Sequence, residues 1–207
     1  MTAVLQTQPR AIAATVPARD DSQHIVFYEG DRVYLRPIEL SDEPVLRRWI
    51  NDPNIWRDLA VYRPMNGVRE REWIERLGTS ADEIVLGIVE RSADVFIGVA
   101  GLRAIHPVNR TARFGIQIGE RAFHGRGFGT EATALVVRYG FEELNLNRIE
   151  LGVFEDNPRA IFVYQRVGFV HEGISRQAYF GNGKYRDVHR FAILREDWER
   201  SRQGTGL

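Results

Sequence analysis

The amino-acid sequence predicts a mixed α+β fold built around a mostly antiparallel sheet. Three β-rich segments, residues 84–90, 95–105 and 111–118, follow one another with turn residues between them, as in a meander. Apolar residues then recur at i, i+3, i+4 and i+7 from Ala132 to Tyr139, which indicates a helix with one buried face. Near the end, Gly181-Asn182-Gly183 separates two β-rich segments and predicts a hairpin. This order of elements is typical of an α+β domain.

The other elements complete this pattern in chain order. Residues 32–38 alternate and are β-branched enough for a first strand, and Ser41-Asp42-Glu43-Pro44 has the composition of a helix start. Residues 68–77 are typical of a second helix with a solvated charged face. Residues 148–154 are typical of a buried strand, and Asn157-Pro158 begins a helix that should end near Gly168. We therefore expect about six or seven strands and about four helices.

The two ends of the chain differ from the segment between them. Residues 1–24 are rich in Ala, Thr, Pro and Gln and contain no apolar run long enough for a signal peptide or a membrane span, so we expect a disordered leader. Residues 201–207 are polar and contain glycine, which predicts a frayed tail. Residues 25–200 then form a single domain, and the absence of a targeting signal favours a cytoplasmic location.

Composition argues against several classes of function. Lysine plus arginine total 28 and aspartate plus glutamate also total 28, so no overall field attracts nucleic acid or an anionic membrane. The chain has no cysteine, which removes disulfides, thiolate metal ligands and a cysteine nucleophile. Its 5 histidines show no H-x-x-H or H-E-x-x-H spacing, and we expect no structural or catalytic metal.

The segment from His124 to Ala132 is a glycine-rich turn that leads directly into a predicted helix. At such a helix start several backbone N–H groups lack an intrahelical acceptor and the helix dipole is positive, so the pattern predicts a phosphate or pyrophosphate site. An ordinary glycine-rich loop before a helix is the alternative. The G-x-G-x-G spacing departs from the dinucleotide fingerprint G-x-G-x-x-G, and no Gly-Lys-Ser/Thr follows as it would in a P-loop.

A second pattern lies downstream, Asn157-x-x-Ala160-x-x-x-Tyr164-x-x-x-Gly168-Phe169. Asn157 is fully explained as the N-cap of a helix. Tyr164 shares helical spacing with Ala160, so its spacing alone favours a place in the core. A phenol with a pKa near ~10 can also donate a proton to a departing thiolate, whose parent pKa is near ~8.5.

The chain resembles the GNAT superfamily of N-acetyltransferases, and within it the branch of ribosomal-protein and spermidine N-acetyltransferases. The resemblance rests on the two patterns above, in this order, and on a looser element, Tyr179-Phe180-x-Gly-x-x-Tyr185-Arg186-Asp187-Val188, which is similar to the closing hairpin of that branch. It covers about residues 32–198. The family's turn usually opens with Gln or Arg where this chain has His124.

The resemblance implies a GNAT-like sheet that splays in the middle and acetyl-CoA as the acetyl donor. The residues implied to bind acetyl-CoA are Phe114, Ile116, Gln117, Ile118, His124, Gly125, Arg126, Gly127, Phe128, Gly129, Thr130, Asn157 and Ala160. The pantetheine arm would lie between the splayed strands along Phe114 to Ile118, and a backbone N–H of that strand would stabilise the oxyanion of a tetrahedral intermediate. Tyr164 would be the catalytic acid.

The acetyl acceptor implied by the family is a primary amine of a small molecule or of a protein N-terminus, bound by residues 56–68 and the closing hairpin. Spermidine acetyltransferases carry acidic residues in the first region, whereas this chain has Arg57, Asp58 and Arg63, which argues against a polyamine site. The two arginines are suited to a carboxylate or phosphate on the acceptor, but each taken singly is better explained as a solvated loop residue. Glu120 and His124 are the nearest candidates for a general base, and each is equally well explained as a surface residue.

Two hypotheses of function follow. The first is an acetyl-CoA-dependent N-acetyltransferase that works by direct attack of the amine. The alternative is a catalytically silent acyl-CoA-binding module of the same fold, used as a sensor or assembly partner, which would have no need of a proton donor at Tyr164. A homodimer is common for the family and for small proteins generally.

Overall fold

The structure is a computed structural model, and it describes residues 25–203. In chain order the strands are β1 (Tyr28–Glu29), β2 (Val33–Pro37), β3 (Ile84–Glu90), β4 (Val95–His106), β5 (Thr111–Ile118), β6 (Arg148–Phe154), β7 (Val170–Gly181) and β8 (Lys184–Leu194). The α-helices are α1 (Glu43–Ile50), α2 (Pro53–Trp56), α3 (Gly67–Leu77), α4 (Phe128–Glu142), α5 (Pro158–Val167) and α6 (Arg195–Gln203), with 3₁₀ turns at Leu40–Asp42 and Arg121–Phe123. None of the helices within residues 25–203 is long and apolar enough to span a membrane.

The eight strands within residues 25–203 belong to one sheet, in the order β1-β2-β3-β4-β5-β6-β8-β7. Every neighbouring pair is antiparallel except β5 and β6, which are parallel and pair only from Thr111–Arg113 to Arg148–Glu150. Beyond those residues β5 stays paired with β4 while β6 stays paired with β8. The sheet therefore splays in its middle, as expected from the resemblance.

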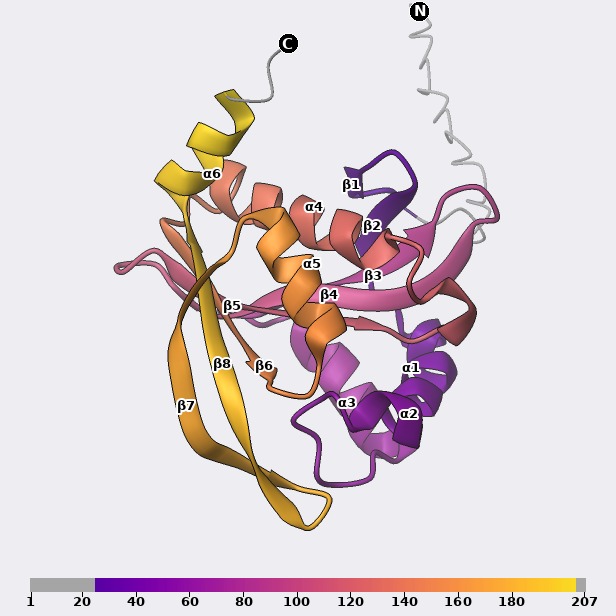
Figure 1. The fold of residues 1–207 in the computed structure, drawn as a ribbon. Helices are drawn as coiled ribbons and strands as arrows, with labels where there is room; N and C mark the ends of the chain where they lie inside the picture. Colours follow the sequence, from indigo (N-terminus) through magenta and orange to yellow (C-terminus); the bar gives the residue numbers. More distant parts are fainter. Residues whose placement is uncertain (1–24, 204–207) are drawn as a thin grey trace, which may run out of the picture.

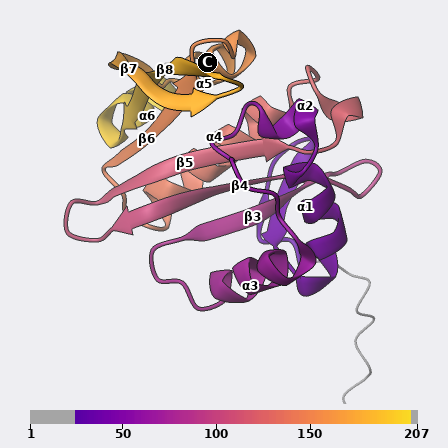
Figure 2. The same cartoon turned by 90° about the horizontal axis from the view of Figure 1, so that it is seen from below.

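Helices cover both faces of the sheet (Figures 1 and 2). Helices α4 and α5 lie on one face, where the main core forms around residues such as Leu102, Val136 and Phe141. Helices α1, α2 and α3 lie on the other face around a smaller core that contains Trp49 and Ile74. On that face, no helix of the described residues covers the part of the sheet that β5, β6 and β8 form (Figure 2).

The structure contains one more strand and two more helices than expected. Strand β1 is only two residues long, too short for an alternating pattern. Helix α2 has four residues that begin after the Asp52 N-cap, and its sequence resembles a polar connector. Helix α6 is strongly polar, and the contact of Trp198 with the Phe141 ring, with centroids 5.3 Å apart, holds it on the domain. The prediction of a frayed tail from residue 201 is wrong in part, because Ser201 to Gln203 continue this helix.

The closing hairpin is as predicted. Strand β7 ends at Gly181 and β8 begins at Lys184, so the loop has two residues. Asn182 and Gly183 both have positive φ, at 54° and 77°, which is the requirement of a type I′ turn. The predicted leader, residues 1–24, lies outside the described residues.

Candidate functional site

A deep groove opens where the sheet splays. It has a volume of about 1750 Å³ and runs from the glycine-rich turn, through the gap between β5 and β6, to the loop that follows α2. One wall is the edge of β5 that β6 leaves unpaired, with Phe114, Ile116, Gln117 and Ile118 among its lining residues. The other wall comes from β6, the middle of β8 and α5. A strand edge without a partner offers free backbone N–H and C=O groups to an extended ligand.

The glycine-rich turn stands at one end of this groove and forms the start of α4. Gly127 is the N-cap with φ at 89°, and Gly125 has φ at 70°, so both occupy the left-handed region that favours glycine. Within residues 25–203, the N–H groups from Gly125 to Thr130 donate no hydrogen bond to the protein. These donors and the positive end of a helix of 15 residues are suited to bind an anion.

His124 joins the turn to both walls of the groove. Its Nε2 donates to the carbonyl of Ile118 at 2.8 Å, and its Nδ1 accepts from Arg159 Nη1 at 3.3 Å. Both ring nitrogens are therefore taken by protein groups, and the imidazole fixes the position of Arg159. The substitution of His124 for the family's usual Gln or Arg thus supplies a contact within the protein.

Three arginines lie around the turn. Of these, the sequence indicated only Arg126 as a residue that binds acetyl-CoA. The Arg126 guanidinium lies 5.2 Å from the centre of the Phe128 ring, and that of Arg32 lies 4.3 Å from the same ring. Arg32 comes from the turn between β1 and β2, and its backbone N–H donates to Glu131 Oε1 at 2.7 Å. Arg159 sits in the first turn of α5 next to the Asn157 cap, so the downstream pattern included its position without indicating its role.

Helix α5 brings Tyr164 to the centre of the groove. Asn157 caps this helix by accepting from the Ala160 N–H at 3.1 Å, and Pro158 occupies the first helical position. Tyr164 is 8% exposed, lines the groove, and contacts the rings of Phe114 and Phe169. Within residues 25–203 its hydroxyl makes no hydrogen bond. Burial raises the pKa of Tyr164 to about 12, so the phenol stays protonated at neutral pH.

Comparison with known proteins shows the family of this chain. Residues 32–170 match the acetyltransferase (GNAT) domain family. The chain belongs to the GNAT acetyltransferase family. It is 30% identical over 171 residues to the "Uncharacterized N-acetyltransferase p20" of Bacillus licheniformis, over 81% of this chain and 96% of that protein. It is 36% identical over 172 residues to the spermidine N(1)-acetyltransferase of Vibrio cholerae, over 82% of this chain and 96% of that protein.

Solved structures agree with the family. The crystal structure of spermidine N-acetyltransferase from Vibrio cholerae in complex with CoA and spermine has a TM-score of 0.78 to this chain, at 28% identity, and the match covers 82% of this chain and 99% of that one. This chain is accordingly an N-acetyltransferase with the GNAT fold. The fold and the activity expected from its two sequence patterns are confirmed.

In this GNAT acetyltransferase, acidic and apolar side chains line the end of the groove beside the loop that follows α2. The sequence suggested arginines for this region. The side chains that line it include Asp58, Met65, Glu70 and Trp73. Arg57 and Arg63, the two arginines of the expected acceptor region, are not among the lining residues. The Arg63 guanidinium instead lies 5.3 Å from the centre of the exposed Tyr62 ring.

Glu70 is the unusual residue of this end. It is 4% exposed, its Oε2 is buried without a hydrogen-bond partner, and no ion pair reaches its carboxylate within residues 25–203. Burial raises the pKa of Glu70 to about 7, the Glu43 carboxylate adds to this increase, and the Arg47 guanidinium opposes it. The burial and the raised pKa of Glu70 cannot be predicted from the sequence pattern, because there Glu70 is one more charged residue of an amphipathic helix.

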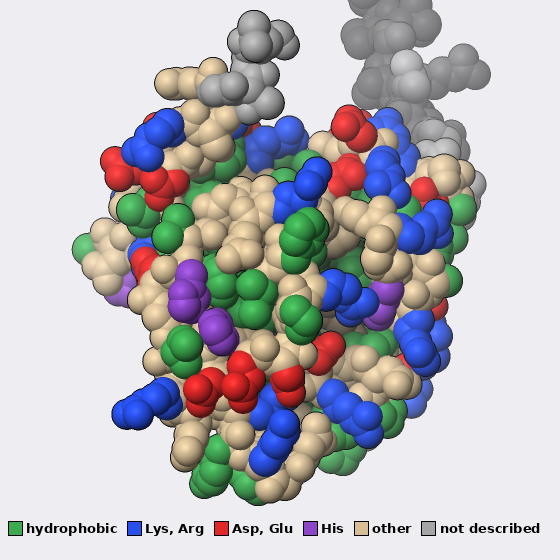
Figure 3. Space-filling view, in the orientation of Figure 1, with side chains coloured by type: hydrophobic (Ala, Val, Ile, Leu, Met, Phe, Trp, Pro, Cys, Tyr) green, Lys and Arg blue, Asp and Glu red, His purple; other side chains and the backbone are tan. Residues whose placement is uncertain are grey.

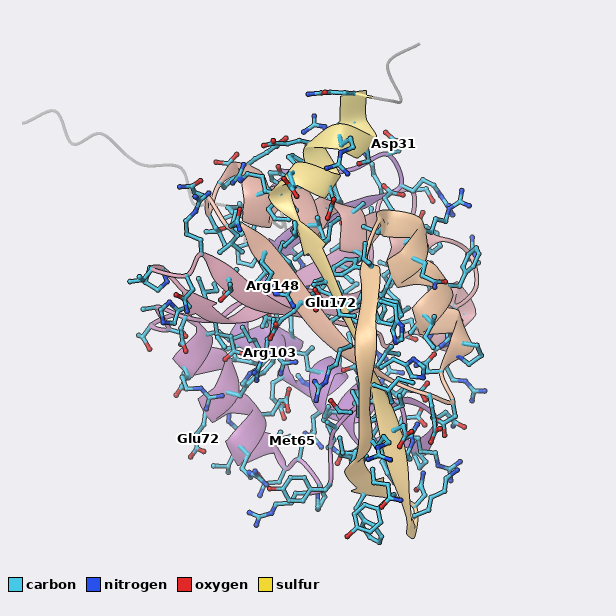
Figure 4. The ribbon with its side chains drawn as sticks, turned by 60° about the vertical axis from the view of Figure 1, so that its left-hand side comes forward. Asp31, Met65, Glu72, Arg103, Arg148 and Glu172 are labelled. Atoms are coloured by element: carbon cyan, nitrogen blue, oxygen red, sulfur yellow. The ribbon has the colours of Figure 1, made fainter. Side chains whose placement is uncertain are left out.

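A row of ion pairs crosses the uncovered part of the sheet and lines the groove there. Arg148 pairs with Glu172 at 2.6 Å and with Glu150 at 3.4 Å, and Arg113 pairs with Glu150 at 3.2 Å. Figure 4 shows Arg148 and Glu172 next to each other, with Arg103 close by. The hydrogen bonds from Arg148 lower the pKa of Glu172, so both groups stay charged at neutral pH.

The two expected candidates for a general base are both engaged elsewhere. Glu120 accepts from Trp49 Nε1 at 3.0 Å and pairs with Arg48, and it does not line the groove. His124 has both ring nitrogens occupied, as described above. Neither side chain is free to take a proton from an amine in this arrangement.

Proposed function

We propose that this enzyme transfers the acetyl group of acetyl-CoA to a primary amine that belongs to a cationic acceptor. The observation that carries the proposal is the protonated hydroxyl of Tyr164, which has no protein partner and lines a groove that begins at an anion-binding helix start. A catalytically silent module of the same fold has no use for such a proton donor. The CoA complex of the related Vibrio cholerae structure supports the same donor.

Acetyl-CoA would lie along the groove with its pyrophosphate at the glycine-rich turn. The free N–H groups of Gly125 to Thr130 would receive the phosphate oxygens, and Arg126 would add charge. The pantetheine arm would extend along the unpaired edge of β5 and make sheet-like hydrogen bonds there. Asn157 and Ala160 line the facing wall. This assignment leaves the thioester between β5 and Tyr164.

The reaction would be a direct acyl transfer. The neutral amine attacks the thioester carbonyl, a C–N bond forms, and a backbone N–H of β5 stabilises the resulting oxyanion. When the carbonyl reforms, the C–S bond breaks and the electron pair stays on sulfur. Tyr164 gives its proton to the departing thiolate and regains one from solvent, while the amine nitrogen loses one proton to solvent, so no net proton is gained or lost. The products are an N-acetylated amine and CoA.

The acidic end of the groove supports an acceptor that carries a positive charge in addition to the reacting amine. Asp58 and the buried Glu70 would face that charge, and Met65 and Trp73 would contact an alkyl chain. Arg57 and Arg63, which suggested a carboxylate or phosphate on the acceptor, do not line the groove. The cytoplasmic location and the homodimer stay predictions.

The test is release of the CoA thiol from acetyl-CoA over a panel of amines matched in length. Diamines should be faster than monoamines with a terminal hydroxyl, and both faster than ω-amino acids. Glu70→Gln should raise the KM of a diamine about 10-fold. Glu72→Gln is the matched control, since Glu72 lies on the same helix and points into solvent (Figure 4). If the protein turned over none of these amines, and no peptide with a free N-terminus, the enzyme activity proposed for this site would be refuted.

A further inference from the structure

Arg186 is a buried cation for which the acyl-transfer chemistry has no use. It comes from the closing hairpin, on β8, and is only 3% exposed. Its guanidinium carbon lies 3.8 Å from the centre of the Phe154 ring, and its Nη2 pairs with Asp156. Its Nη1 donates to the backbone carbonyl of Arg57 at 2.9 Å. One side chain therefore connects three segments that are distant in sequence.

The segment that receives this hydrogen bond forms part of the groove wall. Residues 57–61, here named the strap, follow α2 without helix or strand structure, and residues 58–61 line the acceptor end of the groove. The carbonyl at each end of the strap accepts from the hairpin. Arg186 binds the carbonyl of Arg57, and the Tyr179 hydroxyl donates to the carbonyl of Val61 at 3.4 Å. The strap is thus attached across the groove to the opposite wall (Figure 1).

The third segment leads to the catalytic helix. Asp156 immediately precedes Asn157, the N-cap of the helix that carries Tyr164. Partial burial raises the pKa of Asp156, but the hydrogen bond and charge of Arg186 outweigh this and hold it below its usual range. Acidic side chains gather on the face of the molecule where Figure 1 places the turn from β6 to α5 (Figure 3). Arg186 supplies the buried positive charge beneath this turn.

We propose that Arg186 is a positioning residue that holds the strap over the acceptor end of the groove, in a fixed place relative to the helix of Tyr164. The proposal rests on the acceptor site described under the proposed function. A planar guanidinium is needed because it binds the Asp156 carboxylate and the Arg57 carbonyl at once, with different nitrogens. Arg186 acts on the acceptor through the strap and makes no contact with the reacting atoms.

The variant Arg186→Lys distinguishes the positioning role of Arg186 from the effect of its buried positive charge alone. Lysine keeps the charge for Asp156, but its three N–H donors radiate from one nitrogen, so it does not reproduce the two separate positions from which Nη1 and Nη2 reach the strap carbonyl and Asp156. We expect the KM of the acceptor to rise about 10-fold, because a hydrogen bond to a charged group is lost, while kcat and the KM of acetyl-CoA stay within about 2-fold. Tyr179→Phe removes the other hydrogen bond of the strap, leaves the buried ion pair intact, and should raise the acceptor KM about 3-fold.

Limited trypsin digestion gives a second measurement that does not need activity. Arg57 is exposed at the start of the strap, so release of the strap should speed cleavage after Arg57 at least about 5-fold in Arg186→Lys, as followed by mass spectrometry. Arg176→Met, at an exposed arginine of the same hairpin, is the control and should change neither quantity. The proposal is overturned if both strap variants fold and show the wild-type acceptor KM and cleavage rate. If the wild type turns over no amine, the acetyltransfer proposal fails by itself and cleavage still decides the role of Arg186.

Discussion

The ring of Tyr164 meets the ring of Phe114 edge to face, with centroids 6.1 Å apart and planes at 84°. This contact places the tyrosine of α5 against the strand whose free edge forms the opposite wall of the groove. Phe114 is itself buried, so the aromatic pair fixes where the hydroxyl of Tyr164 lies without giving it a hydrogen-bond partner. Tyr164 belongs to the second sequence pattern, whereas Phe114 belongs to neither pattern and comes from β5.

Tyr164→Phe should reduce kcat by about 100-fold, because the departing thiolate loses its proton donor. The KM of acetyl-CoA should stay within about 2-fold, and thermal stability should not fall, since the hydroxyl makes no hydrogen bond that the mutation would break. CoA thiol release measures the rate, and a melting curve measures the stability. A variant as fast as the wild type would leave Tyr164 with a packing role only.

Gly129→Ala should separate ligand binding from folding at the glycine-rich turn. A Cβ at Gly129 would lie 3.7 Å from Ile118 Cγ1, an ordinary contact, and the position is helical, so the variant should fold at least as well as the wild type. The added methyl group would stand where phosphate oxygens approach the backbone, and we expect the Kd of CoA by calorimetry to rise about 10-fold. An unchanged Kd would place the phosphates elsewhere.

Arg32→Gln should weaken donor binding although Arg32 lies far from the turn in sequence. Its guanidinium rests on the Phe128 ring beside the free N–H groups. We expect the KM of acetyl-CoA to rise about 5-fold, with a smaller salt dependence, and the acceptor KM to stay unchanged. Arg121→Gln is the control, because Arg121 is exposed next to the turn but does not line the groove. Equal effects of the two variants would indicate only general charge attraction.

Glu70→Gln should change how stability depends on pH. The folded-state pKa of Glu70 is about 7 and lies above the unfolded value, so the folded state holds the extra proton between these two values and loses stability as pH rises through this window. The glutamine variant lacks this loss. Relative to wild type it should gain about 2 kcal/mol in its free energy of unfolding between pH 5 and pH 8. Urea unfolding at the two pH values checks this, and parallel curves for the two proteins would contradict the raised pKa.

Periodicity and turn chemistry predicted most of the fold because they act locally. The hairpin at Asn182-Gly183 and the cap at Asn157 depend on residues close in sequence, and both formed as expected. Helix α6 was missed because its stability comes from the distant contact of Trp198 with Phe141 rather than from an apolar stripe. Strand β1 was missed because two residues carry no pattern.

The sequence by itself determined the family, and it predicted the turn suited to phosphates and the role of Tyr164, since each depends on short patterns of fixed spacing. Only the tertiary structure decided what surrounds them. It brought Arg32 to the turn, turned Arg57 and Arg63 away from the groove, and buried Glu70 inside it. The physical reason is that the environment of a charge depends on the groups that other elements pack around it, and one helical or strand period does not contain that information.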